Sequence, residues 1–94
     1  MRIVFDKEAL DDLQSIFVWI SKDDPIAAAG IINRIFDKVE RLISPELTRM
    51  GRFGRDLGTH ELIEGPYIIV YEIDERRALI RVISIVHGAR DAGS

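Results

Sequence analysis

Two runs of apolar residues at helical spacing, separated by a very short connection, constrain this chain more than any other feature of its sequence. The first run recurs from Ala9 to Ile20 and the second from Ala28 to Ile43, and polar residues occupy the opposite faces. Only Ser21-Lys22-Asp23 lies between the two predicted helices. So short a connection predicts an antiparallel helix hairpin, and its apolar side needs a sheet to cover it.

Start and stop signals place the predicted elements. Asp24-Pro25 combines an N-cap acid with a proline at the first helical position, and Ser44-Pro45 ends the second helix. Arg2 to Phe5 is a β-branched and aromatic run that suits a strand. Asp6 follows it directly, and we expect its side chain to cap the first helix.

Three segments of strand composition follow a loop that begins near Gly51. They run from Thr59 to Ile63, from Tyr67 to Ile73 and from Ala78 to Val86. The sequence therefore predicts an α+β fold of element order β-α-α-β-β-β, with the helix hairpin packed on one face of a small antiparallel sheet. At 94 residues the chain has room for one core, so we expect a single domain across residues 1–94.

The register of the two predicted hairpins decides which side chains face the helices. We pair Ile63 with Tyr67 and Ile73 with Ala78, which gives the helices the face without charges. Members of that face are Tyr67, Ile69, Tyr71, Ile73, Ile80, Val82 and Val86. Members of the open face are His60, Leu62, Ile68, Val70, Leu79, Arg81, Ile83, Ile85 and His87. A lone monomer rarely exposes so much apolar surface, so we expect a partner chain across the open face or its edge.

Four residues on or beside the predicted open face could in principle cleave RNA without a metal. In His60, Arg81, His87 and Arg90 the sequence offers a base for the 2'-hydroxyl proton, cations for the phosphate charge and an acid for the leaving oxygen. The alternative is that both histidines are ordinary surface or partner-contact residues. Cysteine is absent and the histidines lack a matching carboxylate cluster, so we expect neither a metal site nor a cysteine nucleophile. Gly51 to Arg55 lacks the lysine of a phosphate-binding loop, and we expect no cofactor.

Charge and hydropathy limit the classes of partner that we expect for this chain. The net charge of -3 argues against a surface that grips nucleic acid as a whole. Locally, Arg49, Arg52 and Arg55 stand close together with Asp56 as the nearby acid, and such a loop either binds a partner or is merely solvated. No apolar run is long enough for a signal-peptide core or a membrane span, which favours a cytoplasmic protein. Trp19 falls outside the apolar stripe of its helix and is either a partner contact or packed within the domain.

Four motifs carry a resemblance to a known family: Gly51-Arg52-Phe53-Gly54-Arg55, Gly58-Thr59-His60-Glu61-Leu62, Tyr67-Ile68-Ile69-Val70-Tyr71 and His87-Gly88-Ala89-Arg90. In this order and at these separations they resemble the signature of the RelE/ParE superfamily of toxins from type II toxin-antitoxin systems. The Asp24-Pro25 helix start also fits, so the resemblance covers nearly the whole chain.

The resemblance implies a growth-inhibiting toxin that is neutralised by a cognate antitoxin, ParD-like with a ribbon-helix-helix start. In such pairs the antitoxin contacts DNA, so no direct DNA or membrane binding is expected of this chain. RelE-like members cleave mRNA on the ribosome, whereas ParE-like members poison DNA gyrase. RelE-like nucleases tend to be strongly basic and commonly have an arginine where this acidic chain has Ile68, which favours the ParE-like side.

Our leading hypothesis from the sequence is therefore a toxin that binds and inhibits DNA gyrase. Residues expected to bind the target or the antitoxin are Arg52, Arg55, Ile68, Val70, Arg81, Ile83, Ile85, His87 and Arg90. The alternatives are a ribosome-dependent, metal-independent mRNA endoribonuclease that uses His60, Arg81, His87 and Arg90, and a degenerate, non-toxic binding module.

Overall fold

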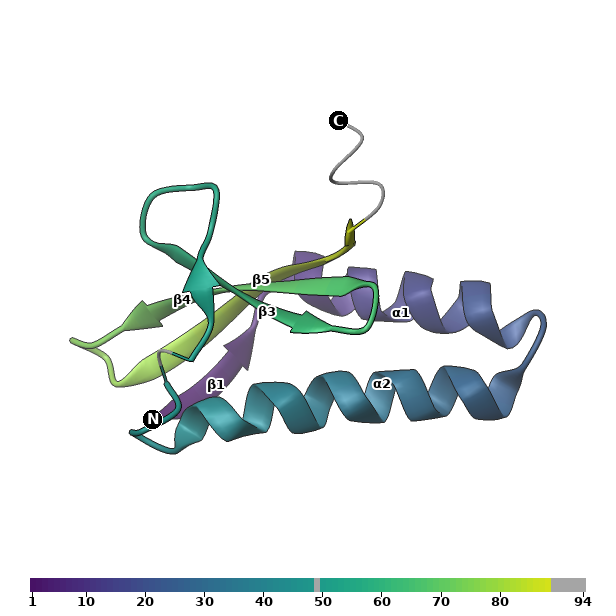
Figure 1. Ribbon diagram of the computed structural model, residues 1–94, viewed down its shortest axis with the longest axis horizontal. Helices are drawn as coiled ribbons and strands as arrows, with labels where there is room; N and C mark the ends of the chain where they lie inside the picture. The colour runs from purple at the N-terminus through teal and green to yellow at the C-terminus, as the bar shows by residue number, and fades with distance from the viewer. Residues whose placement is uncertain (49, 89–94) are drawn as a thin grey trace.

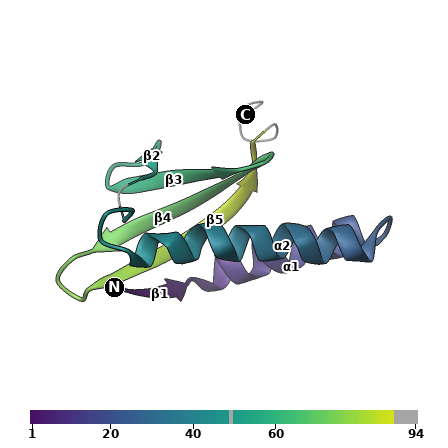
Figure 2. The same cartoon turned by 60° about the horizontal axis from the view of Figure 1, so that its bottom comes forward.

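Two long helices lie against one face of a five-stranded sheet in the computed structural model, which describes residues 1–48 and 50–88 (Figures 1 and 2). The helices are α1 (Lys7–Ser21) and α2 (Pro25–Glu40), and a 3-10 turn, η1 (Arg41–Ile43), extends the second. The strands are β1 (Arg2–Phe5), β2 (Arg52–Phe53), β3 (Thr59–Glu64), β4 (Tyr67–Asp74) and β5 (Leu79–His87). The α+β fold is confirmed, and the predicted elements follow one another in the predicted order.

The sheet is mixed, with the strand order β1-β5-β4-β3-β2. The three long strands form the expected antiparallel meander, while β1 pairs parallel with β5 along Arg2–Phe5 and Leu79–Val82. A two-residue strand, β2, adds an edge that the sequence did not predict. The parallel pair places the first described strand beside the first half of the last one.

The two helix starts differ in how they are capped. The Asp24 carboxylate accepts a hydrogen bond from the backbone N–H of Ala27 at 3.0 Å, and Pro25 opens α2, as the sequence predicted. Asp6 precedes α1, but its side chain makes no cap hydrogen bond. Its carboxylate lies instead 3.5 Å from the guanidinium of Arg81, so the capping role expected for Asp6 was wrong.

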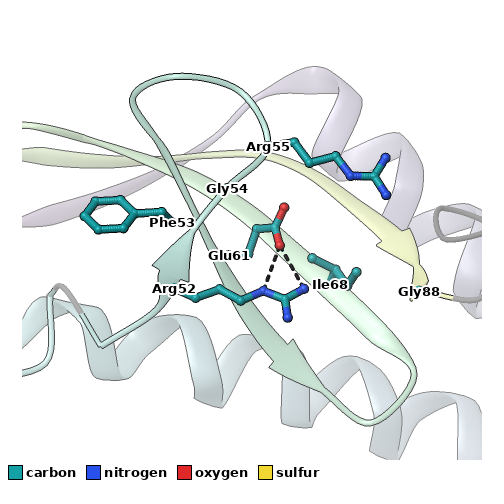
Figure 3. A pocket seen from close by; sticks show the side chains of 7 residues that line it. All are labelled: Arg52, Phe53, Gly54, Arg55, Glu61, Ile68 and Gly88. Atoms are coloured by element: carbon teal, nitrogen blue, oxygen red, sulfur yellow. Dashed lines mark hydrogen bonds and ion pairs between the residues drawn. The ribbon is translucent and has the colours of Figure 1, made fainter.

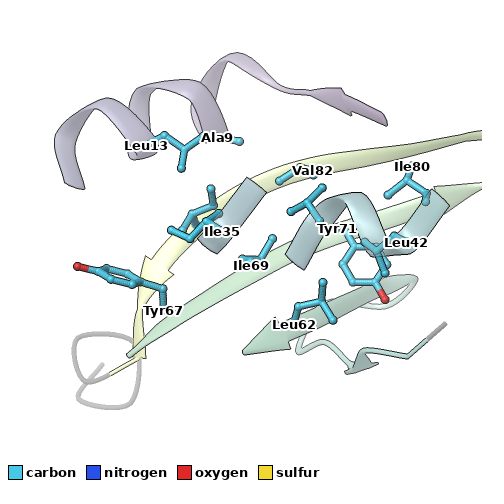
Figure 4. Close-up of a cluster of buried hydrophobic side chains, with 12 residues drawn as sticks. Ala9, Leu13, Ile35, Leu42, Leu62, Tyr67, Ile69, Tyr71, Ile80 and Val82 are labelled. Atoms are coloured by element: carbon cyan, nitrogen blue, oxygen red, sulfur yellow. The ribbon is translucent and has the colours of Figure 1, made fainter. Parts of the chain in front are cut away.

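The core fills the space between the helix hairpin and the sheet (Figure 4). Its fully buried side chains include Ile35 and Val39 of α2, Leu42 of η1, and Ile69 and Tyr71 of β4. Six of the seven side chains predicted to face the helices do so; the exception is Val86. Burial of this cluster is the main force holding the hairpin to the sheet, since each large aliphatic side chain contributes roughly 1.5–3 kcal/mol when removed from water.

The first hairpin has a register one residue away from the predicted one. Glu64 pairs with Tyr67 and Ile63 with Ile68, so the turn has two residues and not three. A shift of one residue moves every side chain of a strand to the other face. His60 consequently pairs with Tyr71 and Leu62 with Ile69, and both lie on the helix-covered face, not on the open face where we expected them.

A bulge changes the faces halfway along the second hairpin. Tyr71 pairs with Val82 but Val70 pairs with Ser84, which leaves Ile83 as an extra residue. Beyond the bulge Ile69 pairs with Ile85, which is buried in the core, so its predicted place on the open face was wrong. Val86 takes the opposite place and pairs with Ile68. His87 pairs with Tyr67, whose ring it meets edge-on at 5.5 Å, so it too leaves the open face.

Candidate partner-binding surfaces

The open face of the sheet carries ion pairs where we expected an apolar patch. Ile68 and Leu79 lie there as predicted, but both are largely buried. Arg81, also on this face, donates a hydrogen bond to the carboxylate of Glu72 and lies 3.5 Å from Asp6. The hydrogen bond to Glu72, with the negative charges of Glu72 and Asp6, raises the pKa of Arg81 above its already high ordinary value. Arg81 is therefore a fixed cation held by two carboxylates.

A second ion pair occupies a shallow pocket at the β2 edge of the same face (Figure 3). Nε and Nη2 of Arg52 each lie 3.0 Å from Oε1 of Glu61, whose side chain is almost completely buried. The pocket has a volume of about 450 Å³, and Gly54, Arg55, Ile68 and Gly88 also line it. The structure thus brings together three of the predicted site residues, Arg52, Arg55 and Ile68, and adds a carboxylate that the sequence analysis did not include.

The structure separates the residues of the hypothetical nuclease. His60 lies on the helix-covered face and is only 9% exposed, whereas Arg81 lies on the open face. His87 ends β5 beside Tyr67. Arg90 lies outside the described residues. The three described members therefore form no common site: two stand on the helix side of the sheet, on different strands, and one on the opposite side.

His60 is the middle ring of a short aromatic series that runs from the core to the surface. Its ring stacks on Tyr71 with centroids 5.3 Å apart, and Phe53 covers its other side at 5.5 Å. Tyr71 is completely buried, while Phe53 is 88% exposed. This geometry gives His60 a packing role between a core tyrosine and an exposed phenylalanine.

Hydrogen bonds from the same tyrosine fix the chain that leads into β2. The Tyr71 hydroxyl donates to the carbonyl oxygen of Thr48 and accepts from the backbone N–H of Gly51, both at 3.2 Å. Oγ1 of Thr48 donates to the carbonyl oxygen of Leu42 at 2.9 Å. A Cβ atom at Gly51 would stand 2.6 Å from both the Tyr71 hydroxyl and the carbonyl oxygen of Glu61, so only glycine fits there. The glycine of the Gly51-Arg52-Phe53-Gly54-Arg55 motif is thereby explained.

Two exposed apolar groups lie away from the open face. One is on the helices, where Val18, Trp19 and Ile26 are exposed near the turn of the hairpin and Lys22 covers the Trp19 ring at 5.2 Å. The other is on the segment from β2 to β3, where Phe53 and Leu57 are exposed. The sequence analysis singled out Trp19 but not Phe53 or Leu57. Nothing in the described part of the chain is a helix that could cross a membrane.

Comparison with known proteins gives the family. A family model described as the ParE toxin of a type II toxin-antitoxin system, parDE, matches residues 3–92. Y4kP of Sinorhizobium fredii (strain NBRC 101917 / NGR234), whose name describes it as a candidate toxin, is 38% identical over 88 residues, which cover 92% of this chain and 86% of Y4kP.

Solved structures share the fold. A chain of the chromosomal ParDE system from P. aeruginosa superimposes with a TM-score of 0.79 at 20% identity, covering 93% of this chain and 95% of that one. A chain of the Mycobacterium tuberculosis RelBE2 complex superimposes with a TM-score of 0.58 at 25% identity, covering 92% and 95%. On the family match and the identity to Y4kP, this chain belongs to the ParE toxin family of type II toxin-antitoxin systems, within the RelE/ParE structural superfamily.

Proposed function

We propose that this toxin acts by binding and inhibiting DNA gyrase, and that a cognate ParD-like antitoxin neutralises it. The observation that carries the choice of mechanism is the separation of the nuclease residues. His60 is packed between Phe53 and Tyr71, and Arg81 is held by Glu72 and Asp6 on the other face of the sheet. General acid-base catalysis requires its groups within hydrogen-bond reach of the same substrate atoms. Their separation supports binding over RNA cleavage.

The net charge of -3 supports the same choice. Binding to RNA phosphates needs a concentration of unpaired cations. Here Arg52 and Arg81 both face carboxylates, those of Glu61 and Glu72. A protein target is a better match to such a surface than a polyanion is.

Support for the antitoxin comes from the exposed apolar side chains of the helix hairpin, Leu10, Phe17, Val18, Trp19 and Ile26. Exposed apolar groups of this extent are typical of protein-protein contacts. The matching P. aeruginosa structure is itself named as a ParDE system. A neighbouring reading frame that encodes a ribbon-helix-helix start and an acidic helical tail would identify the partner.

A side-by-side assay tests the mechanism. Purified toxin is added to gyrase in a supercoiling reaction and, separately, to a translation mixture in which mRNA cleavage is followed. We expect loss of supercoiling and intact mRNA, and we expect mRNA to stay intact with His87→Ala as well. Cleavage of mRNA that disappears in His87→Ala would establish the endoribonuclease instead. Normal growth of cells that express the toxin without antitoxin would indicate the degenerate binding module.

The pocket of Arg52, Arg55 and Glu61 is the one observation that favours the nuclease alternative, since it places cations and a carboxylate on the open face. Glu61→Gln therefore belongs in the translation assay. Loss of cleavage in this variant would place the reaction in the pocket.

A further inference from the structure

We propose that the segment from Arg52 to Gly58, called here the β2–β3 loop, inserts into the toxin's target protein, with Phe53 and Leu57 as its anchors. The inference rests on the proposed function, because it assumes that the toxin acts on a protein. It adds the element that makes the contact and the chemistry of the surface that receives it: an apolar cleft with acidic side chains at its border.

The backbone of the β2–β3 loop is firmly held. Gly54 donates its N–H to the carbonyl oxygen of Thr59 at 2.9 Å. Thr59 in turn donates to the carbonyl oxygen of Asp56 twice, from its backbone N–H at 3.1 Å and from Oγ1 at 2.7 Å. Thr59 itself is buried. The loop is therefore a built turn with a defined shape, and binding would not have to pay the full cost of ordering it.

The ring of Phe53 is supported from below by side chains that lead into the core. Its ring rests on His60, which rests on Tyr71, and the exposed fraction falls from 88% through 9% to zero along the series. In Figure 3 the Phe53 ring points away from Arg52 and Glu61. An aromatic side chain held at its base and open on its outer side has the form of a binding hot spot, because little side-chain freedom remains to be lost on docking.

Leu57 is the second anchor and is fully exposed. Its side chain remains in water after folding, so its burial contributes no free energy to the stability of the chain. One exposed leucine alone needs no explanation. With Phe53, four residues away in the sequence, Leu57 gives a turn fixed by three hydrogen bonds two exposed apolar side chains, and these make up the apolar projection of the loop.

Charge indicates the kind of surface that would receive this projection. Arg52 and Arg55 flank Phe53, whereas Asp56 is the acid within the loop, in a chain whose net charge is -3. The loop is thus locally basic on an acidic protein, which fits an apolar cleft bordered by carboxylates. A single-stranded nucleic acid fits less well, because Leu57 offers a base no ring on which to stack.

The loop is also separate from the exposed side chains of the helix hairpin. In Figures 1 and 2 the β2–β3 loop lies at the β2 edge of the sheet, away from α1 and α2, and the turn between the helices lies at the opposite end of the molecule. A partner seated on the hairpin turn and one seated on the loop would contact different surfaces.

The experiment compares Phe53→Ser and Leu57→Ser with Ile43→Ser, which removes an exposed apolar side chain of η1 that is 44% exposed and has no part in the proposed contacts. Each full-length variant is titrated against the gyrase holoenzyme, and its growth arrest is measured in cells that accumulate equal amounts. We expect at least about tenfold weaker gyrase binding and loss of arrest for both loop variants, in line with hot-spot anchors. Ile43→Ser should bind gyrase and arrest growth as the original chain does, and Phe53→Leu and Leu57→Met should retain most of the activity. Melting temperatures should differ little, since both anchors are exposed.

The outcomes separate this inference from the proposed function. Loop variants that bind gyrase and arrest growth as the original chain does would overturn the inference and leave the gyrase proposal intact. Arrest without any gyrase binding would refute the gyrase proposal. In that case loss of arrest in the loop variants would support the loop as the target contact, and unchanged arrest would overturn it. Tight binding of a labelled single-stranded oligonucleotide that Phe53→Ser abolishes would overturn the inference in favour of a base-stacking site. A chain that neither arrests growth nor binds gyrase would overturn both.

Discussion

The carboxylate of Asp12 accepts a hydrogen bond from the backbone N–H of Ile85 at 2.9 Å and so joins α1 to the last strand. The reason lies in the length of β1, which ends at Phe5 opposite Val82 and covers no more of β5. Beyond that point none of the described strands lies along the outer edge of β5, and an N–H there needs another acceptor. Asp12 supplies it.

Asp12→Ala should therefore lower the free energy of unfolding by about 1–3 kcal/mol, the cost of leaving a partly buried donor without an acceptor. Urea denaturation measures the change. Asp11→Ala is the matched control, because its carboxylate is exposed and pairs with the exposed Lys7, so its loss should cost less than about 0.5 kcal/mol. Equal losses in the two variants would contradict the assignment.

Tyr71→Phe should destabilise the chain by about 1–3 kcal/mol, because it removes the hydroxyl shared by Thr48 and Gly51 and leaves their backbone groups unsatisfied. Faster amide hydrogen exchange at Gly51 would locate the effect. Tyr67→Phe removes a hydroxyl for which no hydrogen bond within the described residues is found, and it should cost less. If Gly51 exchanged at the same rate in both variants, the bridging role of Tyr71 would be refuted.

Arg52 and Glu61 should be energetically coupled more strongly than Arg81 and Glu72. The Glu61 side chain is only 10% exposed, so its charge depends on Arg52, whereas Arg81 and Glu72 are both partly in water. A double-mutant cycle with Arg52→Ala and Glu61→Gln should give a coupling above about 1 kcal/mol. The same cycle with Arg81→Ala and Glu72→Gln should give less than about 1 kcal/mol. The reverse order would be inconsistent with the burial of Glu61.

Ile85→Ala should cost about 2–5 kcal/mol, because the Ile85 side chain is buried in the core beyond the bulge. Val86→Ala removes a partly exposed side chain from the open face and should cost about 1 kcal/mol or less. Chemical denaturation of the two variants distinguishes the observed register from one without a bulge, which would reverse the order of the two losses.

Sequence reasoning located the elements well because their signals are local. The strand Arg2–Phe5 was predicted with its observed bounds, and Asp24-Pro25 marked the start of α2, since β-branched residues and cap chemistry act over a few neighbours. The parallel pairing of β1 with β5 was not predicted, because it depends on how distant segments meet.

Faces were harder to predict than strands. The turn between Glu64 and Tyr67 has two residues in place of the predicted three. This difference alone moves the side chains of His60 and Leu62 to the other face of the sheet. The bulge at Ile83 likewise moves the side chains of Ile85 and His87 to the helix-covered face. The composition of β5 does not indicate this bulge, because isoleucine suits a regular strand equally well. Phe53 and Leu57 carry no charged or titratable group, and only their exposure in the folded chain distinguishes them from core residues.

The parallel pair at the edge of the sheet has a consequence for synthesis. β1 is made before every other described strand, yet its only neighbour in the sheet is β5, the last of them. Its backbone groups must stay unpaired until residues 79–82 have left the ribosome, and pairing between such distant segments also slows folding. A nascent chain therefore cannot complete the sheet until most of it has been translated, so the finished shape of the toxin emerges late in each round of translation.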